Sequence, residues 1–372
     1  MKIKKIFLSF SFLFILFSLN IMLTFKKDNN ISISERRELN KKPSITLKSI
    51  IDGKYFKLEE NYILDQLPFR KKFKTIKSIN EYYVMGKLDN HNIVIKNGHA
   101  TKINYPLKEK SINLYIKKIN YINENYLKEK NVKVYNTLIP DKNYYLLNDE
   151  MYPLINYDDL KNKIKSEINS QYIDIFDCLN VNSYYKTDSH WKQEKIIPVA
   201  NRILNDMNMD INYTYDVSIG FQPFYGVYYG ESSLPLKYED IKYVTTKQID
   251  NTIMYKIDKK TNKFVQSDIY DESVISNEMK DTYDLFLGGA NTIVLFNNFY
   301  SNSNKTLYIF SDSFGRSLAP LLLSNYQRIV LYDIRYTKTS SALEKVNIED
   351  KSDILFAYSI SSIDVSSNIQ EY

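Results

Sequence analysis

The sequence has almost none of the residues from which disulfide frameworks and thiol metal sites are built. Among its 372 residues there is one cysteine, Cys178, which excludes an internal disulfide and any cysteine-based metal cluster. We expect Cys178 to be a small buried residue. Histidine is also scarce, with three residues, and no standard metal-ligand set is visible. The composition therefore predicts a protein without a metal or other cofactor.

Glycine and proline are few, with nine of each, whereas Asn, Ile, Lys and Tyr are heavily used, as expected of an AT-rich genome. The formal net charge is +6, lysine is spread along the chain, and there is no arginine-rich block. No recognised nucleic-acid module accompanies this charge, so we expect no nucleic-acid partner. A mildly basic surface is compatible with polyanionic neighbours such as cell-wall polymers. A hydrophobic content of 44% suffices for one large core, with or without a small lobe.

The amino terminus carries the one long uncharged run, residues 6–25, with three lysines before it and two directly after. This length can cross a bilayer core. A cleaved signal peptide is the alternative, although no clear small-x-small cleavage site follows the run. Three lysines before the run and two after it give almost no preference for either orientation in the membrane. The position of the run at the amino terminus argues that residues 28–372 are exported. We therefore predict a signal-anchor at 1–27, a single membrane pass and an extracytoplasmic carboxy-terminal domain.

Residues 28–75 predict a tether followed by short helices. The polar run from Ser34 to Lys48 is typical of a tether, and Phe56–Lys74 predicts short helical pieces broken near Pro68. A further helix is predicted at Phe73–Val84. We expect the main α/β domain to occupy 76–372.

In that domain, Asn92–His99 predicts a hairpin turning at Asn97-Gly98. Helical and strand patterns then alternate, which is typical of a parallel sheet flanked by helices. Strands are predicted at 132–139, 173–176, 306–310, 328–332 and 353–358, and helices at 112–126, 158–169 and 316–324.

Residues 208–300 break this rhythm. Aromatic residues are interspersed with glycines between Tyr213 and Gly230, and no clear helix is predicted before about residue 275. We expect an irregular or antiparallel insertion lying over the site. The aromatic side chains are either core packing or a platform on which sugars stack.

Ser313 lies where a buried strand turns into a helix. In an open α/β sheet this position exposes the hydroxyl at the carboxyl edge, where such sheets place ligands. The first N–H groups of the helix lack intrahelical partners and can stabilise an oxyanion. An ordinary helix cap is the alternative, because Ser and Asp are favoured capping residues.

A nucleophilic serine needs a general base, and histidine is the usual one near neutral pH. His91 and His99 flank the predicted hairpin. His190 has Asp188 two residues before it, so the carboxylate can orient the imidazole. The chain's one tryptophan, Trp191, follows and can shield the pair from water. A surface histidine and a metal site are the alternatives.

The segment Thr187-Asp188-Ser189-His190-Trp191 resembles the signature of the DHHW proteins, relatives of the alginate O-acetylation proteins in the SGNH-hydrolase-like group. Ser311-Asp312-Ser313-Phe314 is similar to their Gly-Asp-Ser-Phe-type nucleophile block. Further similar segments are Glu35–Leu39, Asp65–Arg70 and Leu287-Gly288-Gly289. The sequence departs from the family pattern where Ser189 replaces a second histidine and Ser311 replaces a glycine.

The resemblance implies an SGNH-hydrolase-like fold in which Ser313 takes an acyl group, His190 is the base and Asp188 orients it. It implies oxyanion donors at the backbone N–H of Ser313 and at a group from Gly288, Gly289 or Asn291, although a plain turn explains the glycines equally well.

Arg335 and Tyr336 follow the next predicted strand at the same sheet edge. They are expected either to contact substrate or to form a surface loop.

By resemblance, the expected function is transfer of acetyl groups to a secreted or cell-wall polysaccharide. The family's usual partner is a multi-spanning membrane O-acyltransferase that delivers the acetyl group. Acetyl-ester hydrolysis is the nearest alternative, because one acyl-enzyme serves either water or a sugar hydroxyl. A non-catalytic polysaccharide-binding or assembly protein is a third.

Overall fold

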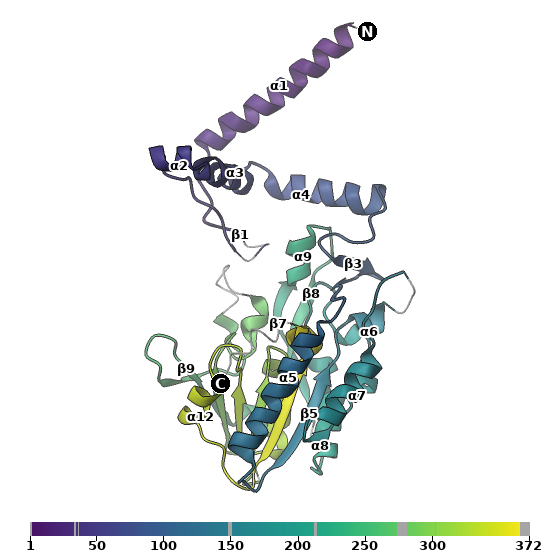
Figure 1. The fold of residues 1–372 in the computed structure, drawn as a ribbon, viewed down its shortest axis with the longest axis vertical. Helices are drawn as coiled ribbons and strands as arrows, with labels where there is room; N and C mark the ends of the chain where they lie inside the picture. The colour runs from purple at the N-terminus through teal and green to yellow at the C-terminus, as the bar shows by residue number, and fades with distance from the viewer. Residues whose placement is uncertain are drawn as a thin grey trace. The chain divides into compact units, whose positions relative to one another are not determined.

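The computed structural model describes residues 2–32, 35, 37–147, 151–211, 214–273, 281–301 and 303–364. The chain divides into two compact units (Figure 1). The N-terminal unit comprises the chain up to His91 together with Tyr229–Pro235, and the main unit comprises the remainder.

An eight-stranded sheet forms the centre of the main unit. Its strands are, in spatial order, β10 (Phe264–Ser267), β9 (Thr252–Ile257), β11 (Ile293–Asn298), β13 (Arg328–Tyr332), β12 (Thr306–Ser311), β14 (Asp353–Ser359), β5 (Lys133–Ile139) and β6 (Gln171–Tyr172). The pairs from β13 to β6 are parallel, whereas β11, β9 and β10 continue the sheet antiparallel. The carboxyl ends of the parallel strands therefore meet at one edge.

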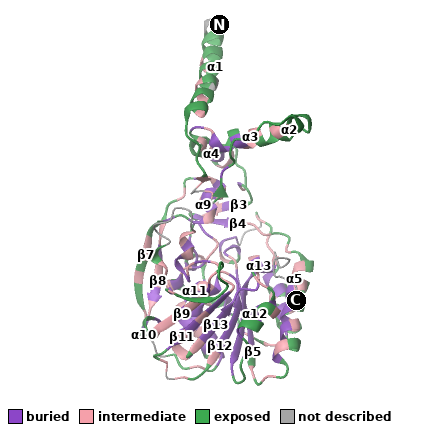
Figure 2. Cartoon of the chain, turned by 90° about the vertical axis from the view of Figure 1, so that its left-hand side faces the viewer, coloured by how far each residue is buried: buried purple, intermediate pink, exposed green. Residues whose placement is uncertain are grey.

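Both faces of the sheet are covered because the parallel strands are apolar at nearly every position. In β12, Leu307 and Ile309 face a core with α8 (Ile197–Asp206) and α11 (Gly315–Leu322). Tyr308 and Phe310 face the opposite core. The second core contains α5 (Glu109–Ile122), α7 (Tyr157–Glu167), α12 (Thr339–Lys345) and α13 (Ile360–Asp364). Figure 2 shows these strands buried between the helices. The predicted α/β class is confirmed.

Local predictions near the amino end of this unit are largely confirmed. β3 (Ile93–Lys96) and β4 (His99–Lys102) form the predicted hairpin, and Asn97 and Gly98 take positive φ values of 51° and 75°, as a two-residue turn requires. The strand predicted at 173–176 is wrong. β6 ends at Tyr172, and the Asp174 carboxylate accepts the N–H of Phe176, which turns the chain out of the sheet.

The insertion expected at 208–300 is only partly correct. β7 (Asp216–Phe224) and β8 (Glu239–Thr245) do form a separate antiparallel pair. However, β9, β10 and β11 extend the central sheet and do not form a cover over the site. Two short helices, α9 (Val227–Ser232) and α10 (Lys247–Asp250), also lie where no helix was expected.

The aromatic residues of this segment are mostly packing residues. Phe224 is buried with Tyr185, Tyr283 and Phe286, and Phe221 packs against the same small core. Tyr215 and Tyr228 pack against other hydrophobic clusters, whereas Tyr213 lies outside the described residues. The packing interpretation therefore holds for these side chains.

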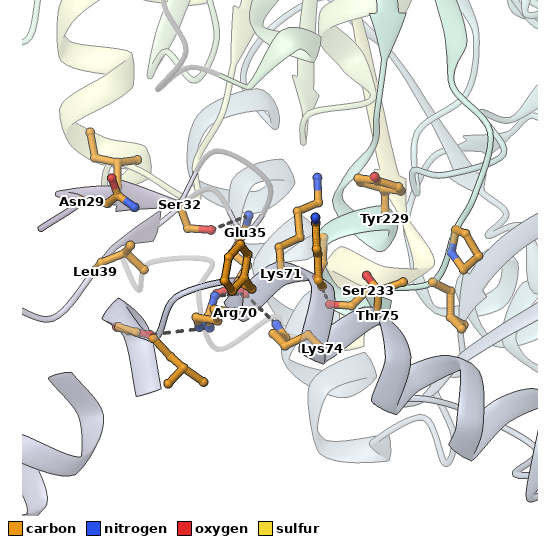
Figure 3. Close-up of a pocket in the computed structure, with 18 of the residues that line it drawn as sticks. Asn29, Ser32, Glu35, Leu39, Arg70, Lys71, Lys74, Thr75, Tyr229 and Ser233 are labelled. Carbon is orange, nitrogen blue, oxygen red and sulfur yellow. Dashed lines mark hydrogen bonds and ion pairs between the residues drawn. The ribbon is translucent and has the colours of Figure 1, made fainter. Parts of the chain in front are cut away.

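The N-terminal unit begins with α1 (Lys2–Phe25), which is long and apolar enough to cross a membrane by length and composition. It continues through β1 (Ile31–Ser32), β2 (Arg37–Glu38), α2 (Leu47–Ile51), α3 (Lys54–Gln66) and α4 (Arg70–Ile79), which ends in a π-helical turn at Asn80–Val84. The domain boundary expected at residue 75 falls inside α4. Residues of this unit line a cavity of about 440 Å³ (Figure 3).

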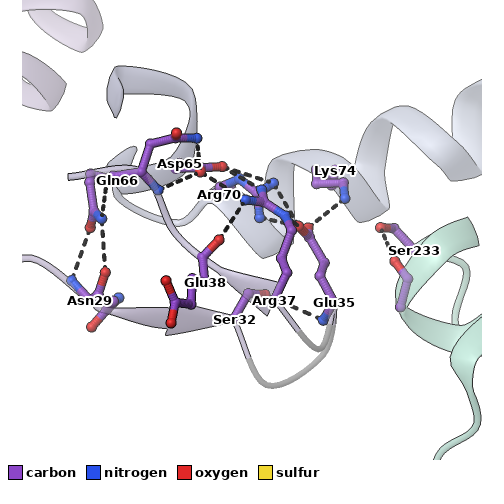
Figure 4. Close-up of polar contacts among 12 residues, drawn as sticks. Asn29, Ser32, Glu35, Arg37, Glu38, Asp65, Gln66, Arg70, Lys74 and Ser233 are labelled. Carbon is purple, nitrogen blue, oxygen red and sulfur yellow. Dashed lines mark hydrogen bonds and ion pairs between the residues drawn. The ribbon is translucent and has the colours of Figure 1, made fainter. Parts of the chain in front are cut away.

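An ion-pair network organises the polar run that predicted a plain tether (Figure 4). Glu35 accepts from Arg70 at 2.6 and 3.0 Å and from Lys74 at 2.6 Å. Arg37 pairs with both carboxylate oxygens of Asp65 at 2.9 and 2.5 Å. Ser34 and Arg36 of the run lie outside the described residues. The charges at 35 and 37 therefore anchor this segment to α3 and α4.

Candidate active site

The turn between β12 and α11 holds Ser313 at the carboxyl edge of the sheet. Ser311, which stands where the DHHW pattern has glycine, directs its hydroxyl to the carbonyl oxygen of Ala357 on β14 at 2.5 Å. Gly315 provides the space, because a Cβ there would lie 2.5 Å from the Cβ of Ser311. The serine substitution at 311 is thus accommodated by the glycine four residues later.

Asp312 fixes the conformation of this turn. Its Oδ1 accepts the N–H of Phe314 at 2.9 Å, and its Oδ2 accepts the N–H and the hydroxyl of Ser359 at 2.9 and 2.6 Å. The backbone N–H groups around this turn therefore donate to the Asp312 carboxylate and not to the Ser313 hydroxyl. Within the described part of the chain, the N–H of Ser313 makes no hydrogen bond, and it is available as an oxyanion donor.

His190 connects Ser313 to Asp188. Its Nε2 lies 2.8 Å from the Ser313 Oγ, and its Nδ1 lies 2.7 Å from Asp188 Oδ1. Because a carboxylate only accepts hydrogen bonds, Nδ1 carries the proton and Nε2 accepts from the serine hydroxyl. The helix-cap alternative for Ser313 and the isolated surface alternative for His190 do not describe this arrangement.

The Asp188 carboxylate is almost fully buried and is held by backbone donors as well as by the imidazole. Oδ1 also accepts the N–H of His190 at 3.1 Å, and Oδ2 accepts the N–H of Val227 at 2.9 Å. Gly226 allows this approach, because a Cβ there would lie 2.3 Å from the carbonyl oxygen of Thr187 and 2.4 Å from the Cβ of Asp188. The aromatic, glycine-containing segment therefore supports the acid.

Lys142 is a residue of the site that the sequence did not reveal. It follows β5 and is buried, and its Nζ donates to the carbonyl oxygens of Asp188, Ala100 and Tyr185 at 2.7, 2.6 and 2.6 Å. Burial lowers the pKa of Lys142 to about 7, although the negative charges of Asp188 and Glu239 oppose this change. Its three donors match three carbonyl acceptors, so it fixes the backbone at Asp188. In the sequence, only the position of Lys142 just after a predicted strand indicated a place near the site.

The ring stacked on the imidazole of His190 is Tyr283, with centroids 3.9 Å apart and planes 13° from parallel. Trp191, predicted to shield the site, is buried edge-on against Phe314 at 5.2 Å. The Tyr283 hydroxyl and the Trp191 Nε1 both contact the Ser317 hydroxyl, at 2.9 and 2.8 Å. Burial raises the pKa of Tyr283, so its phenol stays neutral. The sequence had assigned no role to Tyr283.

The loop with Gly288, Gly289 and Asn291 is joined to α11 by an ion pair between Asp284 and Arg316 at 2.9 Å. Both glycines have positive φ values, and a Cβ on Gly289 would lie 2.7 Å from the carboxylate carbon of Asp284. Asn291 donates its amide to the carbonyl oxygens of Leu287 and Gly289 at 2.9 Å each. The Asn291 side chain therefore shapes its own loop, and an oxyanion role for the glycines stays a prediction.

Arg335 and Tyr336 follow β13 at the same edge of the sheet. Arg335 forms a two-point ion pair with Asp333 at 2.8 and 2.6 Å, and its guanidinium lies 5.4 Å from the centroid of the Tyr336 ring. Against the effect of burial, Asp333 and then Asp312 raise the pKa of Arg335. The guanidinium is therefore paired with Asp333, and contact with substrate stays a prediction.

Solved structures of other proteins match the fold of this chain. A DHHW family protein from Eubacterium siraeum matches with a TM-score of 0.57 and 21% identity, over 74% of this chain and 93% of that one. Bacillus cereus PatB1, in a structure with a sulfonyl adduct, matches with a TM-score of 0.57 and 19% identity, over 73% and 95%. A second PatB1 structure gives 0.54 and 17%, over 73% and 96%. No family model matches the sequence, and no curated protein does. These likenesses confirm that the chain has the expected fold, which it shares with a DHHW family protein.

Proposed function

We propose that the main unit is an extracytoplasmic acyl-transfer enzyme that carries an acetyl group as an ester on Ser313. The observation that supports this most strongly is the series of two hydrogen bonds, 2.7 and 2.8 Å long, from Asp188 through His190 to Ser313. Hydroxyl, imidazole and carboxylate in this order form the arrangement that activates a serine nucleophile.

In the first half-reaction, the Ser313 Oγ attacks the acetyl carbonyl while His190 Nε2 takes the hydroxyl proton. The positive charge that forms on the imidazole is stabilised by Asp188 through Nδ1. The N–H of Ser313 donates to the oxyanion as it develops. When the intermediate collapses, the bond to the leaving group breaks, and His190 returns the proton to that group. An acetyl ester of Ser313 remains.

In the second half-reaction, His190 removes a proton from a sugar hydroxyl, whose oxygen then attacks the acetyl ester. The bond between the acetyl carbon and the Ser313 Oγ then breaks, the new ester remains on the sugar, and the Ser313 oxygen regains the proton from His190. Water in place of the sugar would give hydrolysis, so the acceptor that reaches His190 decides between transferase and esterase.

A secreted or cell-wall polysaccharide is the acceptor that the DHHW resemblance favours. The helix α1 supports a location at the membrane, because its length and composition suit a membrane anchor. The resemblance also favours a membrane O-acyltransferase partner that supplies the acetyl group. Both assignments belong to the proposal.

Replacement of Ser313 by alanine tests the enzyme proposal in cells and with purified protein. We expect Ser313→Ala to abolish turnover of an acetyl ester and to lower the acetyl content of surface polysaccharide. Ser189→Ala is the matched control, since its hydroxyl lies beside the same carboxylate at 3.5 Å and takes no part in the reaction. No turnover by the unmodified protein, together with unchanged polymer acetylation in Ser313→Ala, would favour a non-catalytic polysaccharide-binding protein. Loss of ester hydrolysis with unchanged polymer acetylation would favour an esterase.

A further inference from the structure

Exposed large apolar side chains are concentrated in the N-terminal unit beyond α1. Among the described residues, fifteen of them lie between residues 45 and 88, whereas thirteen are spread over the much longer main unit. On α2, Leu47 and Ile51 are each 82% exposed, and on α3 Phe56 is 62% exposed. Soluble surfaces rarely gather apolar side chains at this density, so something other than water is expected to cover them.

Helix α4 shows the pattern most clearly. Phe73 and Ile76 are exposed and three residues apart, which places them on one helical face, and Phe69, the residue directly before the helix, is exposed as well. The exposed Lys72 and Lys77 lie on either side of this face. A short helix with an apolar stripe bordered by lysines is typical of a segment that lies in the interface of a membrane.

The chain holds these helices close to the end of α1. After α1, the backbone N–H of Asn29 donates to the Gln66 side chain at 3.0 Å, and that side chain donates back to the Asn29 carbonyl oxygen at 2.9 Å. The Tyr62 hydroxyl contacts Asp28 at 3.0 Å. Asn29 is four residues beyond Phe25, and four extended residues span at most about 14 Å. The contact between Asn29 and Gln66 of α3 therefore lies within about 14 Å of the end of α1. If α1 spans the bilayer, α3 therefore lies at the level of the headgroups.

Positive charge is concentrated in the same part of the chain. Residues 26–91 contain 15 Lys and Arg against 9 Asp and Glu, whereas residues 92–372 contain 32 against 35. The excess over the whole chain thus comes from its first 91 residues. Such an excess beside a membrane span favours contact with anionic lipids.

The cavity of the N-terminal unit exposes part of this charge (Figure 3). Arg70 and Lys74 in its wall are neutralised by Glu35. In contrast, no carboxylate of the described residues forms an ion pair with the lining residues Lys26, Lys71 and Lys72. The Lys71 ammonium lies 5.3 Å over the ring of Tyr229. Lys26 donates to the carbonyl oxygen of Gln66 at 3.4 Å, and the Lys72 ammonium lies 5.6 Å from the centroid of the Phe69 ring. None of these contacts neutralises the charge, so the three cations can contact an anion from outside the chain.

We propose that the N-terminal unit binds the surface of an anionic membrane. The exposed apolar side chains of α2, α3 and α4 enter the outer acyl region, and Lys26, Lys71 and Lys72 around the cavity contact lipid phosphates. The span and the excess of cations favour lipid over a partner protein as the cover of these helices. This proposal does not depend on the chemistry at Ser313.

Tryptophan fluorescence of the full-length protein in vesicles tests the proposal. Trp191 is the one native tryptophan and is fully buried in the main unit, so it gives a constant background. An Ile76→Trp variant reports on α4, and Phe299→Trp, at a side chain that is 73% exposed in the main unit, is the matched control. A far-ultraviolet circular dichroism spectrum and a thermal unfolding curve equal to those of the unmodified protein check that both variants are folded.

We expect lipids with brominated acyl chains to quench the added emission of Ile76→Trp and to leave that of Phe299→Trp unchanged. Phosphatidylglycerol in the vesicles should increase this quenching relative to phosphatidylcholine alone, and Lys71→Gln with Lys72→Gln should remove the increase. Added emission that is insensitive to brominated lipids would overturn the proposal. If that emission were also shifted to shorter wavelength, a protein partner or a second copy of the chain would be the cover instead.

Discussion

Replacement of Asp188 by asparagine separates the charge of the proposed acid from its shape. The native carboxylate accepts three N–H groups, from the imidazole Nδ1 and the backbone of His190 and from the backbone of Val227. An asparagine side chain offers one accepting oxygen and one donating NH₂ group. In either orientation of the amide, its NH₂ group, which is a donor, faces an N–H group that is also a donor in the native protein.

With the amide oxygen toward His190, the NH₂ group opposes the N–H of Val227, and a buried donor is left unsatisfied at a cost of about 1–3 kcal/mol in folding stability. With the NH₂ group toward His190, Nδ1 must accept and Nε2 must carry the proton. The imidazole then presents a proton, and not a lone pair, to Ser313. In both orientations the charge that stabilises the imidazolium is lost, and we expect kcat to fall by roughly 10⁴, which is about 5 kcal/mol of transition-state stabilisation.

The assay is turnover of a chromogenic acetyl ester, together with unfolding by denaturant. Asp188→Asn should keep a folded main unit and lose nearly all turnover, whereas Ser189→Ala should retain both. A folded Asp188→Asn protein with more than a tenth of the original kcat would refute a role of Asp188 in orienting the base.

Three further outcomes follow from the structure. Gly226→Ala should destabilise the main unit by about 1–3 kcal/mol and lower kcat in ester assays, because its Cβ would overlap the backbone of Thr187. Tyr283→Phe should keep the stacked ring and cost about 1 kcal/mol in thermal unfolding through the lost hydroxyl contact, whereas Tyr283→Ala should also lower kcat. Despite burial, hydrogen bonds from Arg70 and Lys74 lower the pKa of Glu35 from 4.5 to about 2. Stability from this network should therefore be present above pH 4.5 and be lost as the pH falls toward 2, and hydrogen exchange of α4 should show that loss in the native protein but not in Glu35→Gln.

The strands of the parallel half could be predicted because each is a short run of apolar residues. Thr306–Ser311 and Asp353–Ser359 are buried on both faces, so local composition alone identifies them. β9 and β11 were missed although each contains a short apolar run, at residues 253–255 and 293–296. Both lie in the stretch 208–300 that was expected to be an insertion, and the residues that pair, such as Met254 and Phe296, lie far apart in the sequence.

The pairing of His190 with Ser313 was within reach of the sequence because the chain has so few histidines. The supporting residues were not, since each acts through the backbone of a distant segment. Lys142 holds the Asp188 carbonyl from 46 residues away, and Gly226 makes room for Asp188 from 38 residues away. The Glu35–Arg70 pair is of the same kind, because isolated charges in a sequence carry no sign of the partner that they will meet.

Covalent capture at Ser313 is the most direct test of the proposed chemistry. The purified protein is treated with a serine-reactive sulfonyl fluoride, and the modified residue is located by peptide mass spectrometry. We predict a single adduct on Ser313 that forms much more slowly in His190→Ala. An adduct elsewhere, or none in a preparation that still turns over acetyl esters, would contradict the assignment of Ser313 as the residue that carries the acetyl group.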